Sequence, residues 1–276
     1  SFDVGRLPAF ETLGEVSAGA NVLAYSGKVT LASRTLDLAA RIHDRWYPDM
    51  PGSEQVGERS LYGHLLQSHL YTALGAPAAK LKPIWDQIAD SARRAPKGSR
   101  GSIAEFGWAA AVGLYLQDTT DPTPINELSA LGGGPAPPEL KALVALERGD
   151  STEARRLLQL PDSAVGKEFL SRVQWFGYRQ MIAAHAWVEL GDDQRALKAL
   201  EMFEPARLST SGLDIRWLLL GQARVLRGEI YERLGRAAEA RDQYQLALAQ
   251  WSDADPVLEE MVSRVRARLD RLTGQG

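Results

Sequence analysis

Apolar residues recur at intervals of three and four along much of the chain, the spacing that places them on one face of an α-helix. Residues 29–46 show this pattern, and residues 103–116 are an alanine-rich apolar run that predicts another helix. Residues 258–272 carry an apolar stripe opposite arginines, which predicts a helix with one solvated face. The apolar positions of the first and last of these helices are Leu31, Leu36, Leu38, Ala39, Ile42 and Trp46, and Leu258, Met261, Val262, Val265, Leu269 and Leu272.

Glycines stand between pairs of predicted helices. Gly235 separates RVLRGEIYERL from RAAEARDQYQLAL, and Gly191 and Gly149 take the same place in two earlier segments. These three turns are 44 and 42 residues apart, and Gly75 marks a weaker fourth copy. Glycine accepts the positive φ with which many helices end. The chain is therefore predicted to contain antiparallel helix pairs that repeat along the sequence.

The last of these pairs resembles the tetratricopeptide repeat, a family whose helix pairs carry small, aromatic and turn residues at fixed spacings. Arg227 departs from the pattern, because the family usually has a large aliphatic residue there. The segment from Gly228 to Leu272, with the run from Trp251 to Pro256, is similar to the terminal helices of bacterial members, including receptor-like kinases and regulators. The positions that match the repeat are Gly228, Tyr231, Gly235, Ala240, Tyr244 and Ala247.

The resemblance covers about the last hundred residues and implies a fold and a role. The implied fold is all-α, a right-handed superhelical stack of antiparallel helix pairs (an α-solenoid) with a C-terminal capping helix. The implied role is a bacterial interaction or signalling module. A kinase is not implied, because the chain has no glycine-rich nucleotide loop, no HRD and no DFG motif.

A proline- and glycine-rich segment divides the chain. Residues 121–138 end in GGGPAPP, a composition that disfavours both helix and strand, and are predicted to be a linker. This linker separates a partly repeat-like helical region, residues 1–120, from the repeats and capping helix at 139–276.

Composition and charge narrow the classes of function. The 276 residues are 45% hydrophobic and 24% charged, as in ordinary globular proteins, and the formal charge of -3 provides no field that attracts nucleic acid. The absence of cysteine excludes disulfides and thiolate zinc sites. No apolar run is long enough to span a membrane, and the first residues lack the pattern of a signal peptide. The compartment stays open between cytoplasm and periplasm.

Motifs for catalysis, metals or cofactors are missing from the sequence. His64 and His69 are five residues apart, not the one-turn spacing of zinc ligands on a helix, and no serine lies in a G-x-S-x-G elbow. We therefore predict no catalytic residue, no metal and no cofactor. One basic loop suits a phosphate or an acidic peptide, although basic residues at a helix end also complement its dipole, which is the interpretation we favour. This loop contains Arg93, Arg94, Lys97 and Arg100.

The repeat register points to a binding groove instead. In the fold of this family the first helix of each pair lines a concave groove, and Tyr62 and His69 take the same groove positions in one pair as Tyr178 and His185 in another. Residues seven apart lie on one helix face, so we expect Tyr178 and His185 to share an accessible surface. Chance coincidence is the alternative. The last pair places Gln222, Glu229, Glu232 and Arg233 at matching positions.

Three functions fit this sequence. The leading one is a non-catalytic scaffold whose concave groove binds a segment of another protein, with no nucleic acid partner and no membrane span. The second is a small-molecule sensing domain of a bacterial signalling protein. The third is an enzyme on a helical scaffold that uses residues of the first sixty.

Overall fold

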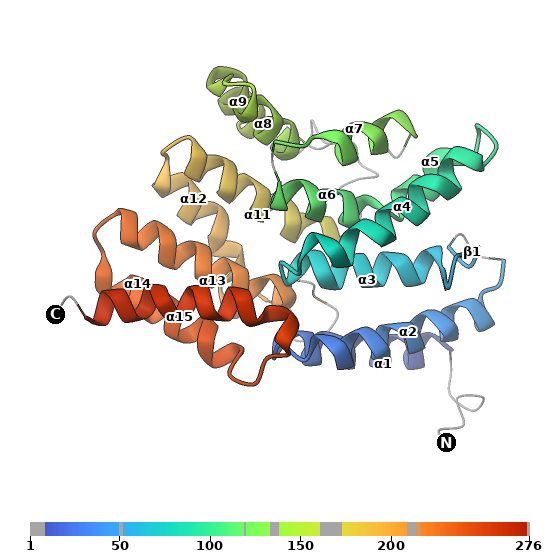
Figure 1. The fold of residues 1–276 in the computed structure, drawn as a ribbon, viewed down its shortest axis with the longest axis horizontal. Helices are drawn as coiled ribbons and strands as arrows, with labels where there is room; N and C mark the ends of the chain where they lie inside the picture. Colours follow the sequence, from blue (N-terminus) through green and yellow to red (C-terminus); the bar gives the residue numbers. More distant parts are fainter. Residues whose placement is uncertain are drawn as a thin grey trace. The chain divides into compact units, whose positions relative to one another are not determined.

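The described residues are mostly helical in the computed structural model, which confirms the prediction of an all-α protein (Figure 1). Its residues divide into two compact units. The described residues within 9–24 and 28–132 form the first unit, and those within 25–27, 138–208 and 214–274 form the second. The structure describes residues 9–49, 52–118, 120–132, 138–160, 173–208, 214 and 216–274.

The first unit is built around α3, which packs against α2, α4 and α6. The prediction of a helix over 29–46 is confirmed, since α2 has these bounds. Its buried face contains Leu36 and Ile42, whereas Leu31 and Leu38 are exposed. The helices are α1 (Ala9–Tyr25), α2 (Val29–Trp46), α3 (Leu61–Ala73), α4 (Ala78–Arg94), α5 (Arg100–Glu105), α6 (Trp108–Gln117) and α7 (Thr123–Ala130).

The apolar run at 103–116 is not the single helix that the sequence predicts. It is divided between α5 and α6, and the break lies at Gly107. A Cβ atom at this glycine would lie 2.9 Å from the ring of Trp85 and 3.1 Å from Ile88. The chain therefore turns where α4 approaches its backbone too closely for any side chain.

The prediction of a linker over 121–138 is wrong for its first half. Residues 123–130 form α7, which buries Ile125 and Leu128 in the first unit. Pro124 is tolerated because it lies in the first turn, where helix N–H groups have no partner within the helix. The side chain of Asp121 accepts the N–H of Thr123 at 3.0 Å. Residues 133–137 of the predicted linker lie outside the described residues.

A short β-hairpin interrupts the helices of the first unit. Strand β1 (Gln55–Val56) pairs antiparallel with β2 (Arg59–Ser60). Gly57, with φ of 67°, occupies the first position of the two-residue turn, as a type II′ turn requires. The sequence analysis missed this hairpin because strands of two residues leave no readable alternation.

The second unit contains three helix pairs, α8 with α9, α11 with α12 and α13 with α14, followed by α15. Neighbouring pairs are in contact, because α11 packs against both α8 and α13. The helices are α8 (Pro138–Glu147), α9 (Ser151–Leu158), α11 (Val173–Glu189), α12 (Asp193–Leu200), α13 (Arg216–Arg233), α14 (Ala237–Gln250) and α15 (Glu259–Thr273), with 3₁₀ turns at Glu201–Phe203, Pro205–Arg207 and Pro256–Leu258. No helix among the described residues is long and apolar enough to cross a membrane.

Four helix pairs turn in the same way, and their turn glycines are those that the sequence predicts. Gly75, Gly149, Gly191 and Gly235 all have positive φ, between 63° and 77°. In each turn the amide after the glycine donates to a carbonyl five residues earlier, as Arg236 does to Tyr231 at 2.8 Å. This bond defines a Schellman motif, so the prediction of glycine-ended helices is confirmed.

The last pair packs as its small residues predict. A Cβ atom at Gly228 would lie 2.4 Å from the ring of Tyr244, and Ala240 is fully buried. Tyr231 is half-buried instead of filling the core, and the guanidinium of Arg236 lies 4.6 Å from its ring centre. The buried side of α15 contains Val262 and Val265, as its apolar stripe predicts, and its exposed side includes Arg264 and Arg271.

Residues 25–27 belong to the second unit, although the sequence analysis places them in a first region of 1–120. The side-chain amide of Gln250 donates to the carbonyl of Tyr25 at 3.0 Å, and the N–H of Asp255 donates to that of Gly27 at 2.9 Å. The ring of Tyr25 also meets Trp217 edge to face, with centres 5.7 Å apart. The boundary is therefore not a single point in the sequence.

Candidate functional site

The predicted groove around Tyr178 and His185 is not an accessible surface. Tyr178 is only 2% exposed, so the expectation of a shared open face is wrong. Burial raises the pKa of Tyr178 far above its usual value and lowers that of His185 to about 4. The reason is packing, because α11 is in contact with α8, α12 and α13.

The matching pair in the first unit is also not an open surface. His69 is 6% exposed, and burial lowers its pKa to about 4. Tyr62 is half-buried and its ring stacks on that of His43, with centres 4.1 Å apart. Burial and the carboxylate of Asp44 raise the pKa of Tyr62. Both residues contribute to the interior of the first unit.

The charged residues predicted on the last pair are engaged within the second unit. Arg268 of α15 forms ion pairs with Glu229 at 3.1 Å and with Glu232 at 3.2 Å. Glu232 also accepts the hydroxyl hydrogen of Tyr244. Arg233 pairs with Asp193 of the preceding helix pair. These side chains connect neighbouring helices, and Arg268 of α15 is the counter-ion of two carboxylates that the sequence assigns to a ligand.

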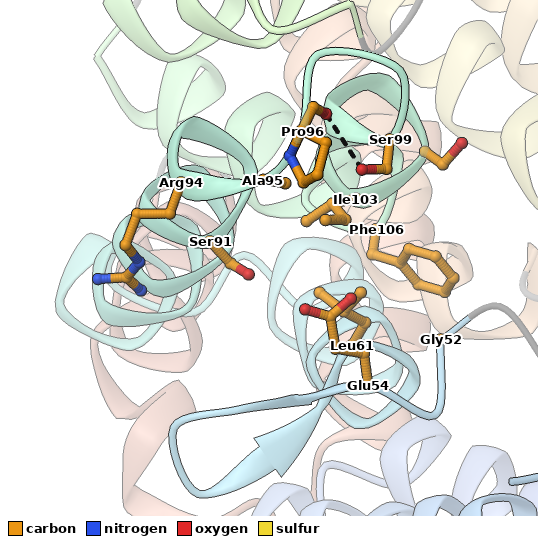
Figure 2. Close-up of a pocket in the computed structure, with 11 residues that line it drawn as sticks. Gly52, Glu54, Leu61, Ser91, Arg94, Ala95, Pro96, Ser99, Ile103 and Phe106 are labelled. Carbon is orange, nitrogen blue, oxygen red and sulfur yellow. Dashed lines mark hydrogen bonds between the residues drawn. The ribbon is translucent and has the colours of Figure 1, made fainter.

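A cavity of about 440 Å³ in the first unit is the best candidate for a binding site. It lies between the start of α3 and the connection from α4 to α5. Figure 2 shows Arg94 and Ser91 on the α4 side, Leu61 and Glu54 on the side of α3, and Ile103 and Phe106 on the α5 side. We call this cavity the α4–α5 pocket, and its lining residues are Gly52, Glu54, Leu61, Ser91, Arg94, Ala95, Pro96, Ser99, Ser102, Ile103 and Phe106.

Backbone hydrogen bonds and the β-hairpin fix the side of the pocket that carries Glu54. The Glu54 carbonyl accepts the N–H of Leu61 at 2.9 Å, which ties this segment to the first turn of α3. Nε2 of the buried His64 donates to the carbonyl of Val56 at 2.7 Å and holds the hairpin to α3. Arg59 attaches the hairpin to α2 through two hydrogen bonds to Asp37, the shorter at 2.8 Å.

The opposite side is fixed by the turn that follows α4. Nε of Arg100 donates to the carbonyl of Ala95 at 3.0 Å. Both the N–H and the hydroxyl of Ser99 donate to the carbonyl of Pro96, at 2.9 and 3.1 Å. The ring of Phe106 reaches across to Gly52, where a Cβ atom would lie 2.7 Å from it. The walls of the pocket are therefore held by bonds that leave the charged ends of Arg94 and Glu54 unused.

The charged side chains of the α4–α5 pocket differ from the adjacent Arg93 in whether they have partners. Neither Arg94 nor Glu54 forms a side-chain hydrogen bond or ion pair with another described residue. The adjacent Arg93, by contrast, donates to Glu127 at 2.8 Å and also pairs with Asp90. The predicted basic loop is thus divided, because Arg94 lines the pocket and Arg93, Lys97 and Arg100 do not.

A second cleft of about 430 Å³ lies beside the same hairpin, but its charges are mostly paired. Asp37 is bound by Arg59, and Asp44 is within 3.3 Å of His43 and 3.4 Å of Gln55. We interpret this cleft as part of the contact surface between the hairpin and α2. Its lining residues are Asp37, Ala40, Arg41, Asp44, Gln55, Glu58, Arg59 and Ser60.

Among the described residues, the arrangement nearest to a catalytic triad is that of Ser53, His43 and Asp44. Both Ser53 Oγ, at 3.5 Å, and Asp44 Oδ1, at 3.3 Å, face the same Nδ1 of His43, whereas a catalytic triad uses the two ring nitrogens separately. The Ser53 hydroxyl donates to the carbonyl of Tyr47 at 2.6 Å. No cluster of three metal-ligating side chains occurs among the described residues.

Comparison of the chain with family models, with curated proteins and with solved structures finds no match. The candidate site therefore depends on the geometry of the chain alone. Of its residues, the sequence analysis singled out Arg94, as part of the basic loop. The acidic and apolar walls come from Glu54, Leu61 and Phe106, which belong to no recognisable motif.

Proposed function

We propose that the protein is a non-catalytic binding module that takes a short segment of a partner protein into the α4–α5 pocket. The observation that carries this proposal is a cavity lined by Arg94 and Glu54, two opposite charges without partners among the described residues, next to an apolar wall. Binding sites commonly combine an apolar lining with a few polar groups that orient the ligand.

The second unit serves as the scaffold in this proposal. Its repeated glycine turns and the contact of Gly228 with Tyr244 support a tetratricopeptide-like stack. Its ion pairs, such as Arg268 with Glu229 and Glu232, connect one helix with the next. The proposal also includes a right-handed superhelical path of the helix pairs, a relation to bacterial signalling proteins and the absence of catalysis.

A pocket-filling substitution tests this function. Short random peptides are selected on the wild-type protein, and their affinities are then measured for Ser102→Trp and Ser252→Trp. Ser102 is exposed at the pocket, whereas Ser252 is an exposed serine in the second unit. The indole of Ser102→Trp should occupy the cavity and weaken binding at least about tenfold, and Ser252→Trp should not. Selected peptides that bind Ser102→Trp as tightly as wild type contradict the proposal.

A small-molecule sensor is the second candidate, and the size of the pocket favours it. A volume of about 440 Å³ lies within the usual range of about 300–1,000 Å³ for small-ligand pockets. A ligand present at about 100 times its Kd should stabilise the protein by about 2.7 kcal/mol. A panel of polar metabolites that produces such a shift in wild type and not in Ser102→Trp supports the sensor. If no metabolite of the panel stabilises the wild-type protein, the sensor function is contradicted.

A further inference from the structure

The geometry points to a ligand that presents one carboxylate and one cationic group on either side of an apolar group. This inference rests on the proposed function and names the chemistry that the α4–α5 pocket selects. In this arrangement Arg94 receives the carboxylate, and Glu54 receives the ammonium or guanidinium. Leu61, Ile103 and Phe106 contact the apolar group.

The charges of the pocket indicate the polar groups of the ligand. Arg94 and Glu54 are 40 residues apart in the sequence, line one cavity, and form no ion pair with each other. Two arginines near the pocket are paired instead, Arg93 with Glu127 and Arg59 with Asp37. A ligand that enters the pocket displaces water from both charges, and it must replace that hydration with opposite charges of its own.

The shape of the pocket indicates the apolar part of the ligand. Leu61 and Ile103 are buried and Phe106 is half-buried, so their apolar surfaces form a firm wall. Gly52 lets the ring of Phe106 approach the backbone, which fixes the edge of this wall. The hydroxyls of Ser91 and Ser102 have no hydrogen-bond partner among the described residues and can donate to a carboxylate.

The charges of the pocket also exclude an inorganic anion as the preferred ligand. A phosphate dianion is attracted to Arg94, but the carboxylate of Glu54 in the same pocket repels it. Arg100, which would strengthen an anion site, donates to the carbonyl of Ala95. Two sources of the required chemistry remain, a segment of a longer chain with an acidic and a basic side chain, and a free dipeptide with charged termini.

The experiment measures the affinity of terminally blocked tripeptides by NMR titration. The doubly charged peptides are Glu-Leu-Lys and Lys-Leu-Glu, and Gln replaces one or both charged residues in the comparison peptides. Free Leu-Leu and inorganic phosphate are titrated alongside. The variants are Arg94→Gln and Glu54→Gln, with Arg93→Gln and Glu58→Gln as matched controls that lie outside the pocket.

One doubly charged peptide should bind wild type about tenfold more tightly than either singly charged version. For Arg94→Gln, replacement of the peptide's Glu by Gln should no longer weaken binding, whereas replacement of its Lys should still weaken it. Glu54→Gln should do the reverse, and both control variants should behave as wild type. Preferential binding of Leu-Leu supports the inference and assigns the ligand to a free dipeptide.

The inference is overturned if the uncharged peptide binds as tightly as the charged ones, if both variants lose the same preference, or if phosphate binds more tightly than every peptide. Its failure is distinguishable from failure of the proposed function. When selected peptides without this charge pattern bind wild type and not Ser102→Trp, the pocket is a binding site and only the ligand chemistry is wrong.

Discussion

Carboxylates on α13 and beside β1 are both accessible to solvent, yet they differ in their partners. Glu229 and Glu232 share Arg268 of α15, at 3.1 and 3.2 Å, and Glu232 also accepts the hydroxyl of Tyr244. Glu54 lines a cavity together with Arg94 and bonds to neither that arginine nor another described side chain. The first region uses its charges to hold helices together, and the second leaves them for a ligand.

This difference changes where a partner is expected. The repeat register places Glu229, Glu232 and Arg233 on a groove, but register alone does not reveal that α15 and the preceding pair supply their counter-ions. The α4–α5 pocket is the stronger candidate, because it combines an apolar wall with two opposite charges that no described side chain binds.

The largest effect should come from a buried ion pair in the second unit. Arg179 on α11 pairs with Glu139 on α8, and their side chains are 4% and 11% exposed. Arg179→Met leaves Glu139 uncompensated and should lower the free energy of unfolding by about 3–5 kcal/mol, measured by denaturant titration. Lys82→Met, which removes an exposed pair with Asp86, should cost less than about 1 kcal/mol. Equal losses in the two variants would contradict structural use of the buried charge.

Acid should destabilise both units through His69 and His185. The pKa values of His69 and His185 are lowered to about 4, whereas an unfolded histidine titrates near 6.5. Between these values the unfolded chain binds protons that the folded chain does not, so stability is complete above pH 6.5 and falls as pH decreases. Each histidine should contribute a loss of about 2 kcal/mol at pH 5, measured as unfolding free energy against pH.

His69→Gln and His185→Gln provide the control for this prediction. Each variant should lose its own share of the pH dependence and keep the other's. A wild-type unfolding free energy that is constant from pH 6.5 to pH 5 would show that these histidines are not enclosed.

The charge network of α13 and α15 should have a smaller effect. Arg268 is 29% exposed, so solvent screens its ion pairs. Arg268→Gln should lower the free energy of unfolding by about 0.5–1 kcal/mol, measured by denaturant titration. Arg264→Gln, on the exposed side of the same helix, should have almost no effect. If Arg268→Gln is as stable as wild type, the contrast between the two regions loses its support.

The smallest effect on stability should come from the pocket itself. Arg94→Gln and Glu54→Gln remove exposed charges that hold nothing together, and each should change the free energy of unfolding by less than about 0.5 kcal/mol. The same titration as for Arg268→Gln measures this. A loss of several kcal/mol in either variant would mean that the charge is structural and would break the comparison.

Much of the helical framework follows from local sequence. The spacing of apolar residues gives α2 its bounds, and the turn glycines mark four helix ends because glycine alone takes positive φ without strain. Gly228 and Ala240 indicate a close helix pair because small side chains permit that approach. The stripe from Leu258 to Leu272 predicts the buried side of α15.

The site was not predictable in the same way. Glu54 and Arg94 line one cavity because a hairpin and a turn bring together parts of the chain 40 residues apart, and no local pattern records this arrangement. Tyr178 and His185 lie seven residues apart on α11, but this spacing cannot tell that packing buries Tyr178. Arg227 illustrates the same limit, since its local sequence does not indicate that its guanidinium pairs with Glu204, at 2.8 Å.

The most direct test measures binding of one pocket-selected peptide to Arg94→Gln and to Arg268→Gln in parallel titrations. Our account predicts that Arg94→Gln weakens binding about tenfold, because the ligand loses a charged partner, while Arg268→Gln binds as wild type does. Tight binding by Arg94→Gln together with lost binding by Arg268→Gln would contradict it and return the ligand to the groove of the second unit.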